Sequence, residues 1–302
     1  MRTVSSFSAN ELAGMLATTG IRLIVPPFVV HVRSDIPVVS EGIEALYAHH
    51  TVRPIGEDFA DFHVSVTPTR RWFRPLCAFE LDGFRPFTPL AIGEAYAFLE
   101  WGLNWCVTGY GHSWLTLHSA VLEKGGRAVI LPAPPGSGKS TLCAALMLNG
   151  WRLLSDEMAL LDPQTLALTP APRPVSLKNQ SIGVIRALAP DAVMGPVAHD
   201  TLKGTVCHLR ASHESFLRSQ ETAFPAWVVF PRYEANSGFQ ISTRGRAQTL
   251  LELTSNSFNH HVHGRAGFDA LARLVDICSC HDLHYSDLDA ALQWFDALEP
   301  PA

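Results

Sequence analysis

Residues 133–141 read A-P-P-G-S-G-K-S-T, and this short stretch constrains the fold more than any other part of the chain. It follows an apolar run at residues 128–131 and precedes an apolar stretch that ends near Gly150. A strand, a glycine-rich loop and a helix in this order form a phosphate-binding unit of α/β proteins. The sequence therefore predicts an α/β fold with this loop at the end of a strand.

The loop has the residue types that binding a phosphate requires. Glycines at 136 and 138 let backbone N–H groups approach an anion without a side chain in the way. A lysine supplies positive charge for the β- and γ-phosphates, a serine offers a hydroxyl to Mg²⁺, and the helix points its positive end at the phosphates. We expect the nucleotide to contact Pro135, Gly136, Ser137, Gly138, Lys139, Ser140 and Thr141.

One position departs from the Walker A pattern, because Ala133 stands where its first glycine belongs. The loop must therefore differ in detail from that of ordinary GTPases. The alternative interpretation is a glycine-rich turn between strand and helix that binds no ligand.

Two adjacent acids and a histidine are the next candidates. Asp156 and Glu157 follow the apolar residues 153–154, on the strand after the loop's helix. One carboxylate could hold Mg²⁺ together with Ser140 while the other accepts a proton from an attacking hydroxyl. The alternative is a pair of ordinary surface acids at a strand end. His118 lies on the strand before the loop, where a structural histidine is the more common case.

Composition narrows the class of protein. The 302 residues hold 23 Lys and Arg against 28 Asp and Glu, and this net charge of −5 argues against a nucleic-acid partner. No apolar run approaches the roughly 20 residues that span a bilayer, and the N-terminus shows no signal-peptide pattern. Six cysteines are too few for a disulfide scaffold. We expect a cytoplasmic protein with free thiols and no membrane partner.

Periodicity and turn signals predict the elements. Ser8 and Glu11 form a capping-box pattern at the start of a helix. Thr88 as N-cap, with Pro89 after it, predicts the start of a longer helix, and Ser286 predicts the start of the last one. We expect strands at residues 28–32, 62–66, 84–87, 113–123, 127–133, 151–161 and 227–230. Strands alternating with helices predict a mixed sheet flanked by helices.

The pattern changes near residue 110. Residues 1–110 are predicted to be an N-terminal α+β region of unknown role, and residues 111–302 a domain around the phosphate loop. No linker rich in Pro, Gly or Ser divides the two parts. The alternative is therefore that residues 1–110 add strands and a helix to one continuous sheet.

Residues 117–161 resemble the catalytic domain of HPr kinase/phosphorylase. The shared features are a histidine on a strand, a short hairpin, a G-x-G-K-S loop, a helix, and two adjacent acids at short spacing. The chain is more closely similar to the group called HprK-related kinase A. The resemblance is specific over about 45 residues and weaker over the rest of residues 111–302.

The resemblance implies a P-loop kinase fold shared with phosphoenolpyruvate carboxykinase, with ATP and Mg²⁺ as cofactors. It implies transfer of phosphate to a serine of a small protein or peptide. Asp156 and Glu157 take the places of the family's paired aspartates, and His118 takes the place of its histidine. Glu157 departs from the pattern, so which acid is the base and which the metal ligand stays open.

Further residues are candidates for phosphate or substrate contacts. The segments that hold Lys178 and Lys203 look like segments of the related kinases, and Arg232 follows a buried-type strand. The family's Arg-Gly-Leu-Gly signature is missing, so the resemblance does not imply phosphorylase activity or HPr itself as the acceptor. Because the family includes hexamers, assembly into a homo-oligomer is compatible with the resemblance.

These observations favour an ATP- and Mg²⁺-dependent kinase in which Lys139, Asp156, Glu157 and His118 are catalytic. Two alternatives stay open. A kinase for a small metabolite could use the same scaffold. A non-catalytic binding module gated by nucleotide would bind ATP without transferring phosphate.

Overall fold

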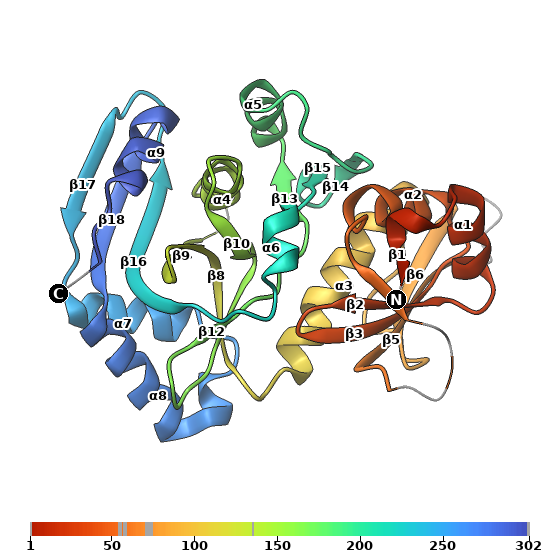
Figure 1. Cartoon of the computed structure of the whole chain (residues 1–302), viewed down its shortest axis with the longest axis horizontal. Helices are drawn as coiled ribbons and strands as arrows, with labels where there is room; N and C mark the ends of the chain where they lie inside the picture. Colours follow the sequence, from red (N-terminus) through yellow and green to blue (C-terminus); the bar gives the residue numbers. More distant parts are fainter. Residues whose placement is uncertain (1, 54–55, 57–58, 70–74, 135, 301–302) are drawn as a thin grey trace. The chain divides into compact units, whose positions relative to one another are not determined.

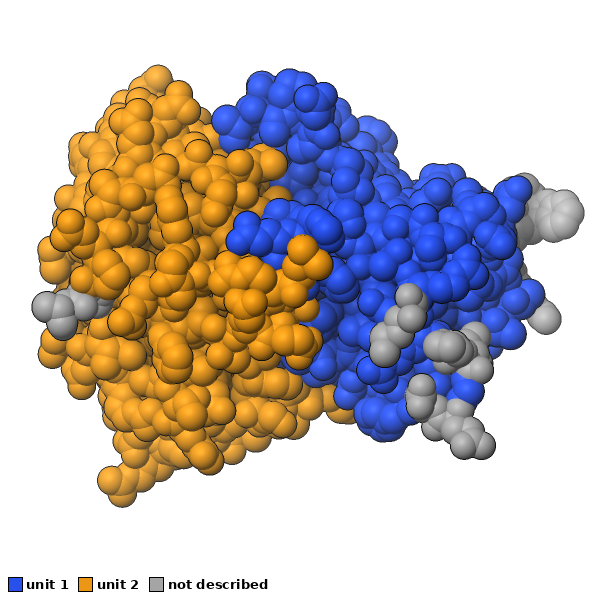
Figure 2. Space-filling view, viewed as in Figure 1, with its two compact units in different colours: residues 1–109, 173–216 blue, residues 110–172, 217–302 orange. Residues whose placement is uncertain are grey.

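The computed structural model describes residues 2–53, 56, 59–69, 75–134 and 136–300. It is a mixed α/β structure whose sheets are flanked by helices (Figure 1). The chain divides into two compact units (Figure 2). Unit 1 comprises Met1–Gly109 and Arg173–Phe216, and unit 2 comprises Tyr110–Pro172 and Leu217–Ala302.

In the described part of unit 1, the larger sheet has seven strands. Their order is β1 (Arg2–Thr3), β4 (Thr51–Arg53), β2 (Ile21–Val25), β3 (Phe28–Arg33), β5 (Phe62–Pro68), β6 (Leu76–Leu81) and β7 (Leu90–Ala91). The helices of this part are α1 (Ala9–Ala17), α2 (Pro37–Leu46) and α3 (Ala95–Tyr110), with short 3₁₀ turns at Val4–Ser6 and Ile92–Glu94. The predicted capping box is confirmed at α1, because Ser8 Oγ accepts from the Glu11 N–H and Glu11 accepts from the Ser8 N–H.

A smaller sheet of three strands completes the described part of unit 1. Its order is β13 (Val175–Lys178), β15 (Gly204–Leu209) and β14 (Ala198–Thr201), and it is accompanied by α5 (Gln180–Leu188) and α6 (His213–Leu217). Ala198 and Val206 of this sheet form one apolar cluster with Ala97 of α3, against which Trp101 packs. The segment Arg173–Phe216 therefore groups with the N-terminal residues, whereas the predicted regions 1–110 and 111–302 assign it to the loop's domain.

The described part of unit 2 is built on one eight-stranded sheet. Its strands run in the order β12 (Leu168–Thr169), β11 (Met158–Leu161), β8 (Leu115–Lys124), β9 (Arg127–Pro132), β16 (Phe224–Tyr233), β18 (Ser279–Tyr285) and β17 (Phe239–Thr243), and β10 (Arg152–Ser155) also pairs with β8. The helices are α4 (Lys139–Leu148), α7 (Arg246–Ser255), α8 (His260–Ile277) and α9 (Leu288–Asp296). Apolar side chains of α8 pack on β8, β9 and β16 to form the core of this unit.

Four predictions about elements differ from the structure. The helix expected from Thr88 begins at Ala95, because Leu90 and Ala91 pair with β6 and keep the chain extended. Residues 84–87 form no strand, and Phe84 makes only an isolated bridge to Leu81. The strand expected at 151–161 is two strands, since the chain bends at residues 156–157. The last helix is capped by Asp287 rather than by Ser286.

Candidate active site

The loop at residues 133–138 connects β9 to α4, as the sequence predicts. Gly136 and Gly138 have φ values of +87° and +85°, which are left-handed conformations that only glycine adopts without strain. A Cβ at Gly138 would also lie 2.7 Å from the Cβ of Tyr233. Both glycines are therefore required by the backbone path. The predicted contact Pro135 lies outside the described residues.

Two tyrosines at the carboxyl ends of neighbouring strands orient the loop. The Tyr233 N–H of β16 donates to the Ser137 carbonyl at 2.8 Å, and the Tyr285 hydroxyl of β18 donates to the Gly138 carbonyl at 3.2 Å. In a trans peptide the C=O and the following N–H point in opposite directions. The N–H groups of Gly138 and Lys139 therefore point away from these strand ends. An anion on that side of the loop can accept hydrogen bonds from them.

Lys139 is the first residue of α4 and is only 7% exposed. Its Nζ has no hydrogen-bond partner among the described residues. Burying an ammonium group without a partner costs several kcal/mol, and a bound anion would remove this penalty. The first N–H groups of the helix also lack partners within the helix. A bound phosphate would therefore satisfy both the lysine and the helix start.

Asp156 is buried and lies at the bend between β10 and β11. Both strands are antiparallel to β8, and the register shifts just before this bend. Cys143, one turn after Lys139 on α4, connects the acid to the loop. Burial, and next the charge of Asp156, raise the pKa of the Cys143 thiol, while the charge of Lys139 lowers it. The charge of Glu157 also raises this pKa, so the structure brings Lys139 and both acids within electrostatic range of one side chain.

Glu157 and His118 form a second pair. His118 Nε2 lies 3.5 Å from Glu157 Oε2, and both side chains are partly exposed. Where β9 leaves the sheet at Pro132, residues 256–258 take its place beside β8, and the His118 N–H donates to the Asn256 carbonyl at 2.8 Å. The ring of Phe258 packs 5.7 Å from the His118 ring. These contacts fix the histidine beside the acid.

The other predicted contacts are distributed over both units. Lys178 at the end of β13 and Lys203 between β14 and β15 belong to unit 1, outside the unit that holds the loop. Lys203 Nζ lies 5.1 Å from the centre of the Trp101 ring. Arg232 near the end of β16 belongs to the same unit as the loop, is exposed, and lies 3.9 Å from Glu234. Of these three residues only Arg232 shares a unit with the loop.

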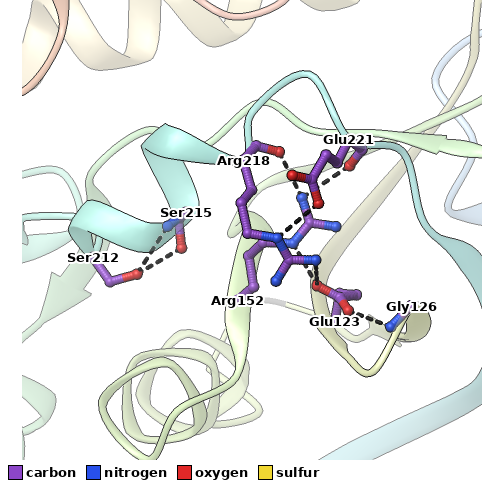
Figure 3. Close-up of polar contacts among 7 residues, drawn as sticks. All are labelled: Glu123, Gly126, Arg152, Ser212, Ser215, Arg218 and Glu221. Carbon is purple, nitrogen blue, oxygen red and sulfur yellow. Dashed lines mark hydrogen bonds and ion pairs between the residues drawn. The ribbon is translucent and has the colours of Figure 1, made fainter.

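A buried ion pair that sequence analysis missed holds the start of β10. Arg152 and Glu123 are both almost fully buried and form an ion pair across β8 and β10 (Figure 3). Arg152 also donates to the carbonyls of Arg218 and Glu221, at 2.7 and 2.8 Å. This network lies four residues before Asp156 and fixes the register that places the acids. The only sequence signal is a charged residue within an apolar strand, beside Trp151.

The predicted magnesium ion would have to share its ligands between the protein and a bound phosphate. Among the described residues, no three His, Cys, Asp or Glu side chains are grouped closely enough to hold a metal. Mg²⁺ at phosphate sites is usually held by one or two carboxylates, with phosphate oxygens and water completing its shell. The half-buried Ser140 and the acid pair would supply such ligands.

No family model matches the sequence, and no curated protein matches it either. Within the described residues, none of the helices combines the length and the apolar character needed to cross a membrane.

Proposed function

We propose that this chain is an ATP- and Mg²⁺-dependent phosphotransferase with a P-loop kinase fold of the HPr kinase and phosphoenolpyruvate carboxykinase type. The observation that carries the proposal is the buried Lys139 ammonium without a hydrogen-bond partner among the described residues, at the start of a helix. A ligand that brings several negative charges to this point satisfies the lysine and the helix start together.

The neighbouring residues divide into two roles. The charge of Asp156 acts on the buried Cys143 thiol of α4 more strongly than the charge of Glu157 does, so with Ser140 Asp156 is the better candidate for the metal ligand. Glu157 pairs with His118, so these two residues would orient the acceptor hydroxyl and take its proton. This division proposes an answer to the question that sequence analysis left open, namely which acid performs which role.

In the proposed reaction the acceptor oxygen forms a bond to the γ-phosphorus and the bond to the β-phosphate oxygen breaks. The acceptor proton passes to the Glu157–His118 pair. Mg²⁺, when bound, neutralises the charge of the phosphates. The Lys139 side chain and the backbone N–H groups of Gly138 and Lys139 hold the γ-phosphate in place. Positioning and charge stabilisation provide most of the catalysis.

The exposure of the acid–histidine pair supports a large acceptor. The side chains of His118 and Glu157 are 28% and 23% exposed, so a hydroxyl on the surface of another molecule can reach them. This agrees with the serine of a small protein or peptide that the family resemblance implies.

The test is incubation of the purified protein with Mg²⁺ and γ-labelled ATP, alone and with a lysate of its host, beside Lys139→Met and Asp156→Asn. We expect label in a discrete protein or peptide band with the wild type and in neither variant. Label only in small molecules would favour a metabolite kinase. Nucleotide binding without any transfer would contradict catalysis and favour a binding module.

A further inference from the structure

A pocket of about 560 Å³ opens beside the phosphate loop, within unit 2. Loop residues Pro134, Gly136 and Ser137 form one wall. The carboxyl ends of β16 and β18 form another, and Glu252 of α7 contributes to a third. Ligands of α/β sheets bind outside the carboxyl ends of parallel strands, and β9, β16 and β18 are mutually parallel neighbours here.

The pocket and the acid pair lie on opposite sides of β9 in the order of the sheet. Asp156 and Glu157 join β10 and β11, which both pair with β8, whereas the pocket is built on β16 and β18. The proposed reaction places the terminal phosphate of the donor at the acids. The rest of a donor bound across the loop then extends toward the pocket.

A buried arginine organises the polar groups of the pocket. Arg244 is 10% exposed, forms ion pairs with Asp282 and, at 3.5 Å, with Glu252, and its guanidinium lies 4.2 Å from the centre of the Phe230 ring. Its Nε is buried without a hydrogen-bond partner among the described residues. The arginine thus holds two partly exposed carboxylates in fixed positions at the pocket.

These groups suit a nucleoside and not a bare phosphate chain. Carboxylates accept hydrogen bonds from hydroxyl and amino groups. The lining holds two arginines, Arg232 and Arg244, beside the two carboxylates, so it offers no surplus of positive charge for a pyrophosphate chain. The ring of Tyr233, which also lines the pocket, is half exposed next to the loop and offers a face on which a base can stack. A nucleoside has the hydroxyls, the amino group and the aromatic face that match this set.

We propose that this pocket holds the nucleoside of the phosphate donor, with Glu252 and Asp282 accepting hydrogen bonds from it and Tyr233 stacking on its base. The donor is then a nucleoside triphosphate and not pyrophosphate. This inference rests on the proposed function, because it assumes that the loop binds phosphate. It adds to that function the residues that select the donor.

The test compares Mg²⁺–ADP with Mg²⁺–pyrophosphate by titration calorimetry on the full chain. We expect wild type to bind ADP more tightly than pyrophosphate. Glu252→Gln keeps the shape of the side chain. We expect it to lower the affinity for ADP about tenfold, because one charge-assisted hydrogen bond is lost, and to leave the affinity for pyrophosphate unchanged. Tyr233→Ala should weaken ADP in the same selective way. Glu44→Gln, an exposed change on α2, is the matched control and should change neither affinity.

The outcomes separate the two proposals. If wild type binds pyrophosphate at least as tightly as ADP, or if both variants bind ADP like wild type, the nucleoside pocket is overturned while the phosphate loop stands. If the variants lose the same affinity for ADP and for pyrophosphate, the nucleoside pocket is also overturned, because the substitutions would then affect phosphate binding at the loop and not nucleoside binding. If wild type binds neither ligand, the proposed function itself fails.

Discussion

Each compact unit buries a charged side chain, but the two charges have opposite surroundings. In unit 1, Glu100 of α3 is 3% exposed and accepts hydrogen bonds from the hydroxyls of Tyr47 and Tyr96, at 2.8 and 2.7 Å. Arg173 Nη1 lies 3.7 Å from its other oxygen. In unit 2, the Lys139 ammonium is buried without a hydrogen-bond partner among the described residues.

The difference separates a charge that the protein compensates from one that we propose a ligand compensates. A buried carboxylate with three partners is compensated within the protein, so its removal leaves those partners unsatisfied. A buried ammonium without a partner destabilises the free protein until an anion binds. The following predictions test this contrast, beginning with the largest expected effect.

Lys139→Met should lower phosphate transfer about 10³-fold or more, because it removes a charge that stabilises the transferring phosphate. It should not lower the free energy of unfolding without ligand, since the lysine has no hydrogen-bond partner among the described residues to lose. Activity assays and urea unfolding of the same preparation check both parts. A large loss of stability would show that Lys139 is structural and would remove the contrast with Glu100.

Glu100→Ala should lower the free energy of unfolding by about 3–5 kcal/mol, because it leaves a buried arginine and two tyrosine hydroxyls without their acceptor. Tyr47→Phe removes one hydrogen bond to a charged group and should cost about 1.5–3 kcal/mol. Urea unfolding measures both. A change within about 0.5 kcal/mol of wild type for Glu100→Ala, as expected of a surface substitution, would contradict the structural role.

Glu157→Gln should lower phosphate transfer about 10²-fold, the usual contribution of a positioned base, while ADP affinity stays near that of wild type. Steady-state kinetics and calorimetry separate the two quantities. If Glu157→Gln retains full activity and Asp156→Asn loses it without losing Mg²⁺ binding, the roles of the two acids are exchanged.

The smallest expected effect is the acid sensitivity of the buried ion pair. Burial alone would raise the pKa of Glu123, but hydrogen bonds from Arg152 and the Gly126 N–H hold that pKa below its usual value of 4.5. A carboxyl with a lowered pKa contributes stability above its unfolded value, and this is lost as the pH falls through the folded value. The free energy of unfolding should therefore decrease below about pH 4.5.

The control for this prediction is the double variant Glu123→Gln/Arg152→Met, which removes both charges. Its unfolding free energy, measured by urea titration from pH 7 to pH 3, should depend less on pH than that of wild type. Equal pH dependence of the two proteins would assign the acid sensitivity to other carboxyls.

Local patterns predicted elements in both units. The strand, loop and helix around residues 136–141 follow from glycine freedom and apolar runs, and the capping box at Ser8 depends on residues three positions apart. Propensity failed at Thr88, where a good N-cap and a proline were overruled by the pairing of Leu90 with Cys77. Capping contributes only about 1 kcal/mol, so strand pairing and burial decide such cases.

The candidate site was predictable in its residues but not in its arrangement. Lys139, Asp156, Glu157 and His118 are visible as residue types at suggestive spacing. That Asp156 is buried at the bend while Glu157 pairs with His118 depends on that bend and on a register shift against β8. Tyr233 and Tyr285 were missed, because an aromatic residue at a strand end gives no local sign of the carbonyl to which it donates.

The glycine-rich loop was predictable from the sequence, because glycine conformation, a following lysine and a helix start are properties of neighbouring residues. Three arrangements became visible only in the folded chain: two strand ends orient the loop, Arg244 holds two carboxylates beside it, and Arg173–Phe216 groups with the N-terminal residues. Those arrangements join residues far apart in the chain. Their energies come from pairing and burial, which exist only once the sheets have formed.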